Sequence, residues 1–255
     1  MQCTSAPILP ADAIKPIIGI QVTKAKRAMI QFYLSKDLAK DLASLPIEKN
    51  PPQGEADTGA VIWYAHRVTI MRRKCIIAME LQSRYTMVFC GLTKPDFHNF
   101  AQLFGQRLLQ EACVITQLQE PLPDADVQLL CELANEVSME QSFACHSDRS
   151  VQSHINQVKE HLEDLVLRGG YPLPESPDDS MRFGLIANDM LRKTKNHKDY
   201  FVPLEVYADF WLGMIRHVKE RVGSSMLDEG PEGAVSDTQG GGKVIAVDFV
   251  KRRRK

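Results

Sequence analysis

Residues 61–91, VIWYAHRVTIMRRKCIIAMELQSRYTMVFCG, contain three short strand-like segments separated by turns. The first segment, at about residues 61–70, places alternating side chains on one face: Ile62, Tyr64, His66, Val68 and Ile70. The segments at about 74–81 and 84–91 follow so closely that only hairpins can connect them, with MRRK and QS as the turns. This stretch therefore predicts a three-stranded antiparallel meander.

The segments on either side of the meander predict helices that pack on it. Before it, RAMIQFYLS (27–35) alternates like a strand, and Ser35 can cap a following helix. After it, Thr93 and Asp96 resemble a capping box at the start of a helix with an aromatic stripe. Strand signals stop after residue 112. We expect an α+β fold in which a small antiparallel sheet, made of the strand-helix start and the meander, is packed by helices and followed by a helical C-terminal half.

Composition changes divide the chain into five parts. We expect a flexible arm at 1–14, an α+β sheet domain at 15–115 and a helical region packed on it at 116–222. A flexible Gly- and Ser-rich linker at 223–243 then leads to an apolar-basic tail at 244–255. The tail either adds to an open sheet edge or is disordered without a partner. In both cases the cations Arg252, Arg253 and Arg254 are available to an anionic surface.

The overall composition excludes several classes of protein. A 44% hydrophobic fraction and a net charge of −1 are typical of ordinary globular proteins without a general attraction to nucleic acid or anionic lipid. The six cysteines form no CxxC pair, which favours reduced thiols and a cytoplasmic location. No run of eighteen apolar residues and no secretion signal is present, so no membrane partner is expected.

Motif searches predict neither a cofactor nor a metal. The chain has no GxSxG elbow, no Walker A loop and no GxGxxG after a strand. Cys145, His146, His154 and His161 lie close in sequence, but they match no recognised metal-ligand spacing. No catalytic set can be assembled from spacing alone.

His66 and Trp63 are the obvious candidates within the meander. His66 shares its face with apolar side chains, so a hydrogen-bonded structural histidine is favoured over a catalytic one. Trp63 points the other way and is expected to pack under a helix or loop. Asn156 and Asn188 fall on apolar faces of later helices, where they are expected to bond each other or a backbone group.

The charge distribution is uneven along the chain. The turn residues Arg72, Arg73 and Lys74 make the meander basic, whereas residues 108–148 contain eight acidic residues and no Lys or Arg. Three interpretations stay open: acidic helices dock on the basic sheet edge within one chain or between subunits, the turn contacts phosphate or nucleic acid, or solvent alone surrounds these charges.

Several segments resemble a known family. MIQFYLSKDLAKDL, WYAHRVTIMRRKCII and RYTMVFCGLTKPDFHNF are similar to an uncharacterised bacterial family catalogued only as a domain of unknown function. The similarity covers about residues 28–112, and RSVQSHINQVKEHLEDLV and FGLIANDM resemble the helical extension behind it. The matching motif residues are Trp63, His66, Arg72, Arg73, Lys74 and Cys75. Met71 departs from the Asn typical of that turn. The resemblance implies an architecture and no activity.

These patterns together favour a non-catalytic protein-interaction module that binds a protein partner or self-associates. The first alternative is an accessory protein that contacts nucleic acid through Arg72, Arg73, Lys74 and the basic tail. The second is an enzyme centred on His66, with Trp63 and Cys75 as structural residues of the same motif.

Overall fold

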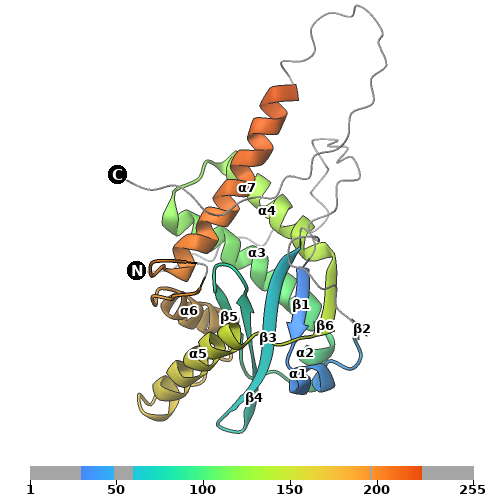
Figure 1. The fold of residues 1–255 in the computed structure, drawn as a ribbon, viewed down its shortest axis with the longest axis vertical. Coiled ribbons are helices and arrows are strands. Elements are labelled where there is room, and N and C mark those ends of the chain that lie inside the picture. Colours follow the sequence, from blue (N-terminus) through green and yellow to red (C-terminus); the bar gives the residue numbers. More distant parts are fainter. Residues whose placement is uncertain (1–29, 49–59, 196, 226–255) are drawn as a thin grey trace, which may run out of the picture.

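The computed structural model describes residues 30–48, 60–195 and 197–225, and its core is a single six-stranded sheet (Figure 1). The strand order is β2-β6-β1-β3-β4-β5. The strands are β1 (Ile30–Leu34), β2 (Ile47–Glu48), β3 (Val61–Ile70), β4 (Arg73–Glu80), β5 (Thr86–Phe89) and β6 (Gln141–Cys145).

The antiparallel meander is confirmed as β3-β4-β5, with His66 opposite Ile77 and Ile77 opposite Val88. The other half of the sheet is parallel, because β1 pairs with both β3 and β6 and β2 pairs with β6 in that sense. The predicted α+β class is confirmed, but the sheet is mixed and larger than the sequence pattern predicts.

Seven helices are described, and several of them begin where the sequence predicts. They are α1 (Lys36–Asp41), α2 (Lys94–His98), α3 (Phe100–Gln119), α4 (Asp124–Met139), α5 (Arg149–Leu167), α6 (Pro177–Asn188) and α7 (Pro203–Ser225). Ser35 caps α1 by accepting the Leu38 N–H, and Thr93 forms a capping box with Asp96 at α2. The predicted arm, most of the linker and the tail lie outside the described residues.

Helices cover both faces of the sheet (Figure 1). On one face, which we call the aromatic face, α3, α4 and α7 bury side chains such as Phe32, Trp63, Phe104 and Trp211. On the other, the α5 face, α5 and α6 bury Tyr64, Ile77, Val88, Ile155 and Phe183. Alternation along each strand separates the two cores. None of the described helices is long and apolar enough to cross a membrane.

Strand β6 is absent from the sequence-based prediction, which expects only helices after residue 112, and that prediction is wrong. The strand is five residues long and lies between β1 and β2. Its register places Gln141 beside Ile30, and the Ser142 hydroxyl donates to Gln31 Oε1 at 2.6 Å. A short strand whose partner is more than a hundred residues away leaves little local pattern to recognise.

Asn188 closes the edge of the sheet at β5. Its side chain accepts the Thr86 N–H at 2.7 Å and donates to the Thr86 carbonyl at 2.8 Å, and it is fully buried. An edge strand otherwise exposes unpaired backbone groups, so this amide replaces a missing neighbour. The prediction of a structural role is confirmed for Asn188. It is wrong for Asn156, which is exposed on α5.

Candidate functional site

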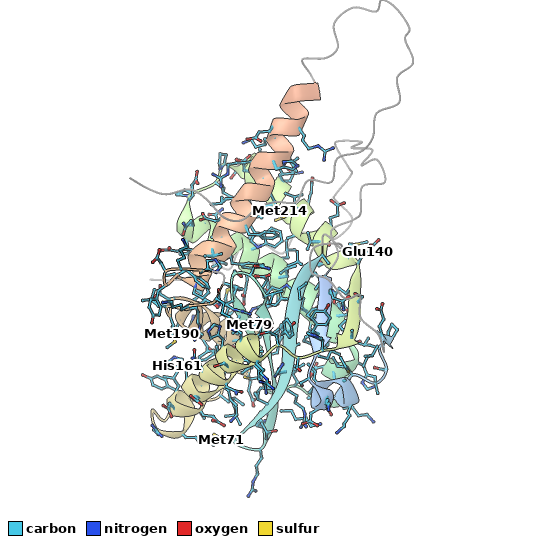
Figure 2. The ribbon with its side chains drawn as sticks, in the orientation of Figure 1. Met71, Met79, Glu140, His161, Met190 and Met214 are labelled. Carbon is cyan, nitrogen blue, oxygen red and sulfur yellow. The ribbon has the colours of Figure 1, made fainter. Side chains whose placement is uncertain are left out.

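The tip of the β3–β4 hairpin has an unusual backbone. Met71 and Arg72 have φ values of 46° and 63°, the left-handed pair that a tight two-residue hairpin turn requires. Asn and Gly adopt this conformation readily, whereas Met does so at a cost. The Asn that the resemblance implies for this turn would suit the conformation better than Met71, which lies exposed at the lower end of the molecule (Figure 2).

Two of the three cations at this turn are engaged with carboxylates of the same chain. Arg73 contacts Glu175 at 2.9 Å, and Lys74 contacts Asp41 at 2.8 Å. Neither acid belongs to the acidic segment 108–148, so these two ion pairs do not join that segment to the basic turn, and docking of the acidic helices on the meander stays a prediction. Asp126 of that segment pairs instead with Lys219 on α7. Arg72 is exposed at the tip, and Arg252, Arg253 and Arg254 lie outside the described residues.

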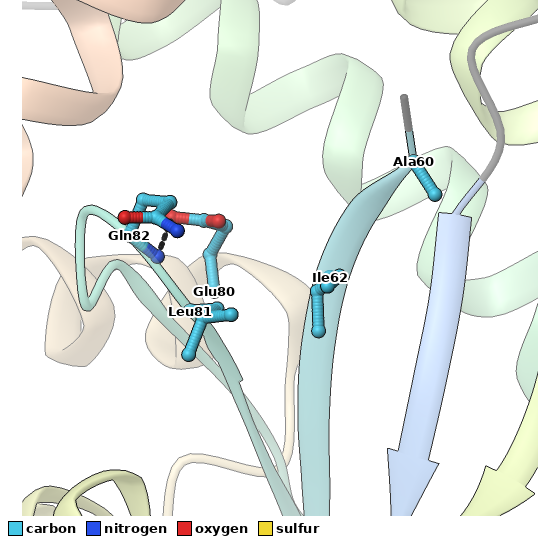
Figure 3. Close-up of a pocket in the computed structure, with 5 residues that line it drawn as sticks. All are labelled: Ala60, Ile62, Glu80, Leu81 and Gln82. Carbon is cyan, nitrogen blue, oxygen red and sulfur yellow. Dashed lines mark hydrogen bonds between the residues drawn. The ribbon is translucent and has the colours of Figure 1, made fainter. Parts of the chain in front are cut away.

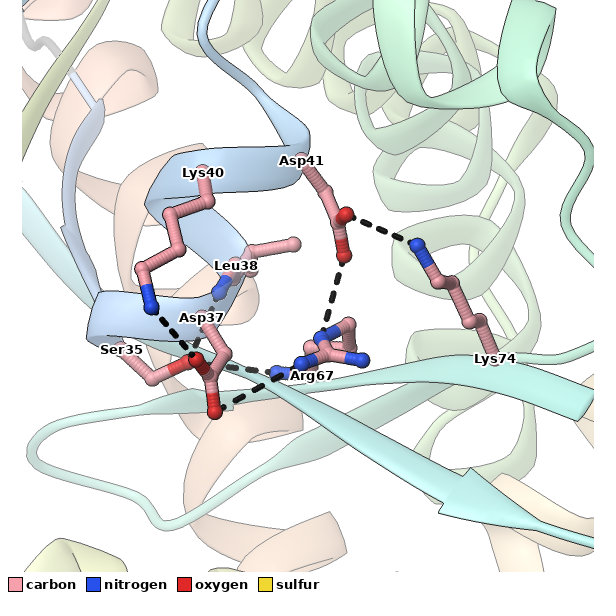
Figure 4. Close-up of polar contacts among 7 residues, drawn as sticks. All are labelled: Ser35, Asp37, Leu38, Lys40, Asp41, Arg67 and Lys74. Atoms are coloured by element: carbon pink, nitrogen blue, oxygen red, sulfur yellow. Dashed lines mark hydrogen bonds and ion pairs between the residues drawn. The ribbon is translucent and has the colours of Figure 1, made fainter. Parts of the chain in front are cut away.

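The pair formed by Lys74 belongs to a larger polar network around α1 (Figure 4). Arg67 on β3 contacts Asp37 at 3.5 Å and Asp41 at 3.1 Å. The Ser35 hydroxyl, besides capping α1, accepts the Arg67 N–H at 3.4 Å. These contacts tie α1 to β3 and β4 with nearly balanced charge, so the network is a better structural brace than an anion site.

The other motif residues occupy the two cores. Trp63 is fully buried on the aromatic face, where its ring lies 4.9 Å from Phe104 and 5.9 Å from Tyr207. Cys75 is buried on the α5 face. His66 is partly buried on the α5 side of β3, and this burial lowers its pKa. A neutral, partly buried imidazole is compatible with the structural role expected of His66. That role stays a prediction.

A tyrosine–histidine cluster missed by the sequence patterns lies at the carboxyl ends of the parallel strands. The Tyr64 hydroxyl is 3.1 Å from His146 Nδ1, and the Tyr33 ring centroid is 4.8 Å from that of His146. Ligands of open α/β sheets often bind at this end of the strands. In the described part of the chain, no three His, Cys, Asp or Glu side chains come together as a metal site, and no carboxylate contact completes a catalytic set with His146.

A small pocket lies between β3 and the β4–β5 turn (Figure 3). Its lining residues are Ala60, Ile62, Glu80, Leu81 and Gln82, and its free volume is about 70 Å³. Burial raises the pKa of Glu80, whose carboxylate accepts the N–H groups of Gln82 and Ser83 at 2.9 and 2.6 Å. Organic ligands need several hundred Å³, so this pocket fits only water-sized molecules.

Exposed large hydrophobic side chains are most frequent in the segment from the end of α5 to the start of α7. Of the nine large hydrophobic side chains exposed in the described residues, six fall between residues 167 and 200. Four of these form what we call the loop patch: Ile186, Met190, Leu191 and Tyr200. An antiparallel bridge between Arg192 and Phe201 folds this segment back on itself, and Met190 lies at the edge of the molecule (Figure 2). No helical or strand periodicity marks this segment, so the sequence patterns miss it.

Comparison with known proteins identifies a family for this chain. The model of the family described as "Domain of unknown function (DUF6933)" matches residues 31–206, which extend from β1 into α7 and include the whole hairpin motif. No match was found among curated proteins. The resemblance of the hairpin and of the helical extension to an uncharacterised family is therefore confirmed, and the chain belongs to this family of unknown function.

Proposed function

We propose that this domain is a non-catalytic protein-interaction module that contacts its partner through the loop patch. The observation that carries this proposal is the exposure of Leu191 and Tyr200, which are 62% and 65% accessible and lie on either side of the Arg192–Phe201 bridge. Apolar groups gathered on a surface favour association, because their burial removes them from water.

Charges beside the loop patch indicate the chemistry of the partner. Lys193, Lys195 and Lys198 are exposed on the same segment, where they outnumber Asp189 and Asp199. A surface that combines apolar side chains with acidic ones would therefore complement it.

A second copy of the chain carries such a surface on α4. Met139 is 74% exposed, and Glu132 and Glu136 are exposed on the same helix, in a segment without Lys or Arg. A contact between the loop patch of one copy and α4 of the next is head-to-tail, so it leads to chains of molecules unless the rotation closes a ring. This extends the expectation of subunit docking through the acidic helices.

Sedimentation velocity across a range of concentrations tests the proposal. The sedimentation coefficient is expected to rise with concentration at low salt and to rise less at about 1 M salt, where charges are screened within about 3 Å. Leu191→Glu and Glu136→Lys should each abolish the rise, whereas Met71→Glu at the hairpin tip should leave it unchanged. A wild-type protein that stays monomeric at the highest attainable concentration would exclude the second copy as partner.

The nucleic-acid alternative gains less support. Arg73 and Lys74 are engaged with Glu175 and Asp41, which leaves Arg72 as the exposed turn cation without a carboxylate contact among the described residues. The basic tail on which that alternative also depends lies outside the described residues.

A further inference from the structure

Three basic side chains gather in the interior between the β4–β5 turn, α5 and the segment after α6. Arg84 is 6% exposed, Arg192 is 5% exposed and His154 is 8% exposed. We call these three residues the cation cluster. Arginine is seldom buried without a carboxylate, so the surroundings of this cluster decide what it does.

One stripe of α5 holds the cluster in place. Ser150, His154 and Gln157 recur at helical spacing on this helix. The Arg84 guanidinium donates to the Ser150 hydroxyl at 3.3 Å, and Arg192 Nη1 donates to the Gln157 side-chain oxygen. His154 lies between these two contacts along the helix. Gln157 is exposed, so the Arg192 end of the cluster reaches solvent.

The backbone around the two arginines is also constrained. Arg84 adopts a left-handed conformation with φ of 61°. Arg192 exchanges two backbone hydrogen bonds with Phe201, at 2.8 and 2.9 Å. The backbone that carries the two guanidinium groups is therefore constrained before any ligand arrives, which reduces the entropy lost on binding.

Arg192 lacks a countercharge. Among the described residues it forms no ion pair, its one side-chain partner is the neutral amide of Gln157, and its buried Nε has no acceptor. His154 Nδ1 is likewise buried without a partner. A buried guanidinium in this state is costly unless an anion joins it.

The electrostatics of His154 follow from the same arrangement. Burial lowers its pKa to about 4, and the positive charges of Arg84 and Arg192 act in the same direction. Burial lowers the pKa of His197, and the charge of Arg84 acts in the same direction. Burial raises the pKa of Glu80, whose ionised form Arg84 favours. At neutral pH the imidazole of His154 is therefore uncharged.

We infer that the cation cluster is a binding site for a phosphate group, with Arg192 and Arg84 as charged donors and His154 as a third donor. Guanidinium groups match the oxygens of phosphate in both charge and geometry. An anion supplies the countercharge that Arg192 lacks among the described residues, and neither apolar nor cationic ligands satisfy the orphaned Arg192 Nε. The group comes either from inorganic phosphate or from a small phosphate monoester.

Thermal unfolding with added phosphate tests the site on the full chain. Inorganic phosphate is expected to raise the melting temperature above that in sodium chloride of equal ionic strength, and a phosphate monoester that binds better would identify the source. Arg192→Gln should weaken phosphate binding at least about tenfold, the loss expected for a charge-assisted hydrogen bond. Arg182→Gln, an exposed arginine on α6, is the matched control and should bind like wild type.

The melting temperature of Arg192→Gln distinguishes a binding role of Arg192 from a structural one. Without phosphate, Arg192→Gln should melt at or above the wild-type temperature, because the substitution removes an uncompensated buried charge. NMR of the wild-type protein supplies a readout that needs no variant: the pKa of His154 should rise when the anion binds. Sulfate serves here because it remains a dianion while histidine titrates.

Three results would overturn the inference. The first is a wild-type melting temperature and a His154 titration that respond to phosphate or sulfate no more than to chloride. The second is an equal phosphate response in Arg192→Gln. The third is a response to acetate as large as that to phosphate, which would assign the site to carboxylates.

Discussion

Arg107 and Arg192 are each 5% exposed, yet their surroundings differ. Arg107 on α3 forms an ion pair with Glu111 one turn later and donates to the Pro177 carbonyl. Glu111 in turn accepts the Tyr85 hydroxyl at 2.6 Å. Arg192, by contrast, finds only the amide of Gln157 among the described residues. The charge of Arg107 is therefore paired with a carboxylate, whereas the charge of Arg192 is not paired among the described residues.

The comparison shows that burial alone does not reveal the role of a charged side chain. Burial raises the pKa of Glu111, but Arg107 and Tyr85 favour its ionised form and offset part of this effect. The resulting pair connects α3 to the sheet and to the start of α6, so it specifies packing. Arg192 has no acidic partner among the described residues, so the same residue type at the same burial leaves a charge with which a ligand can interact.

Replacing each arginine by Met tests whether the two sites differ in their contribution to stability. Arg107→Met strands the buried Glu111 carboxylate and should lower the free energy of unfolding by about 3–5 kcal/mol, the cost of removing one member of a buried pair. Arg192→Met should lower it by less than about 1 kcal/mol or raise it. Urea denaturation of both variants measures the difference, and equal losses would show that the two sites are not distinct.

The next largest effect concerns pH and His154. The pKa of His154 is about 4 in the folded protein against 6.5 for an ordinary histidine, so the unfolded chain takes up the proton first as the pH falls. The contribution of this residue is complete above about pH 6.5 and is lost toward pH 4, a loss of about 3 kcal/mol.

The measurement compares the unfolding free energies of wild type and His154→Gln across this range. Only the difference between the two proteins is informative, because lowered pKa values at His66 and His197 and raised ones at Glu80 and Glu111 also contribute. Parallel pH profiles would show that the pKa of His154 is not lowered in the folded protein.

A smaller effect is expected for His66, which lies on the α5 side of β3 and outside the cation cluster. His66→Ala should reduce the free energy of unfolding by about 1–3 kcal/mol, because packing is lost and any group bonded to the imidazole is left without its partner. Thermal unfolding measures the change, with His98→Ala, an exposed histidine on α2, as the control. An unchanged melting temperature in His66→Ala would contradict a structural role.

The smallest effect is expected for the hairpin. Arg73 and Glu175 remain 55% and 44% exposed as a pair, so Arg73→Gln should cost at most about 1 kcal/mol and less in high salt. Arg72→Gln, one residue earlier at the exposed tip, is the matched control and should have almost no effect. A salt-independent loss in Arg73→Gln would assign it a packing role instead of an electrostatic one.

Much of the fold is predictable because its signals are local. The alternation in residues 61–89 predicts β3, β4 and β5. Four apolar side chains at helical spacing predict the helix that follows, which the structure divides into α2, with Phe97, and α3, with Phe100, Phe104 and Leu108. Ser176 followed by Pro177 and two aspartates predicts the start of α6. Each of these patterns lies within one element, so no knowledge of distant partners is needed.

The candidate sites are much less predictable. Arg84 looks like an ordinary turn cation, and Arg192 lies in a segment with several lysines. Their burial depends on α5 packing against the turn and on the bridge to Phe201, which no spacing in the sequence reveals. The basic turn at 72–74 was visible, but its partners Asp41 and Glu175 lie 33 and 102 residues away from it.

The sequence by itself determined the local conformations of this protein: which segments alternate, where helices begin and which turn closes the hairpin. These features follow from interactions among neighbouring residues, which periodicity and capping record. Only the tertiary structure shows that β6 lies beside β1, that Arg107 donates to the Pro177 carbonyl at the start of α6, and that Arg192 is buried with no acidic partner among the described residues. The physical reason is that pairing and burial across a hundred residues depend on the packing of the whole chain, and such contacts leave no pattern in any one segment.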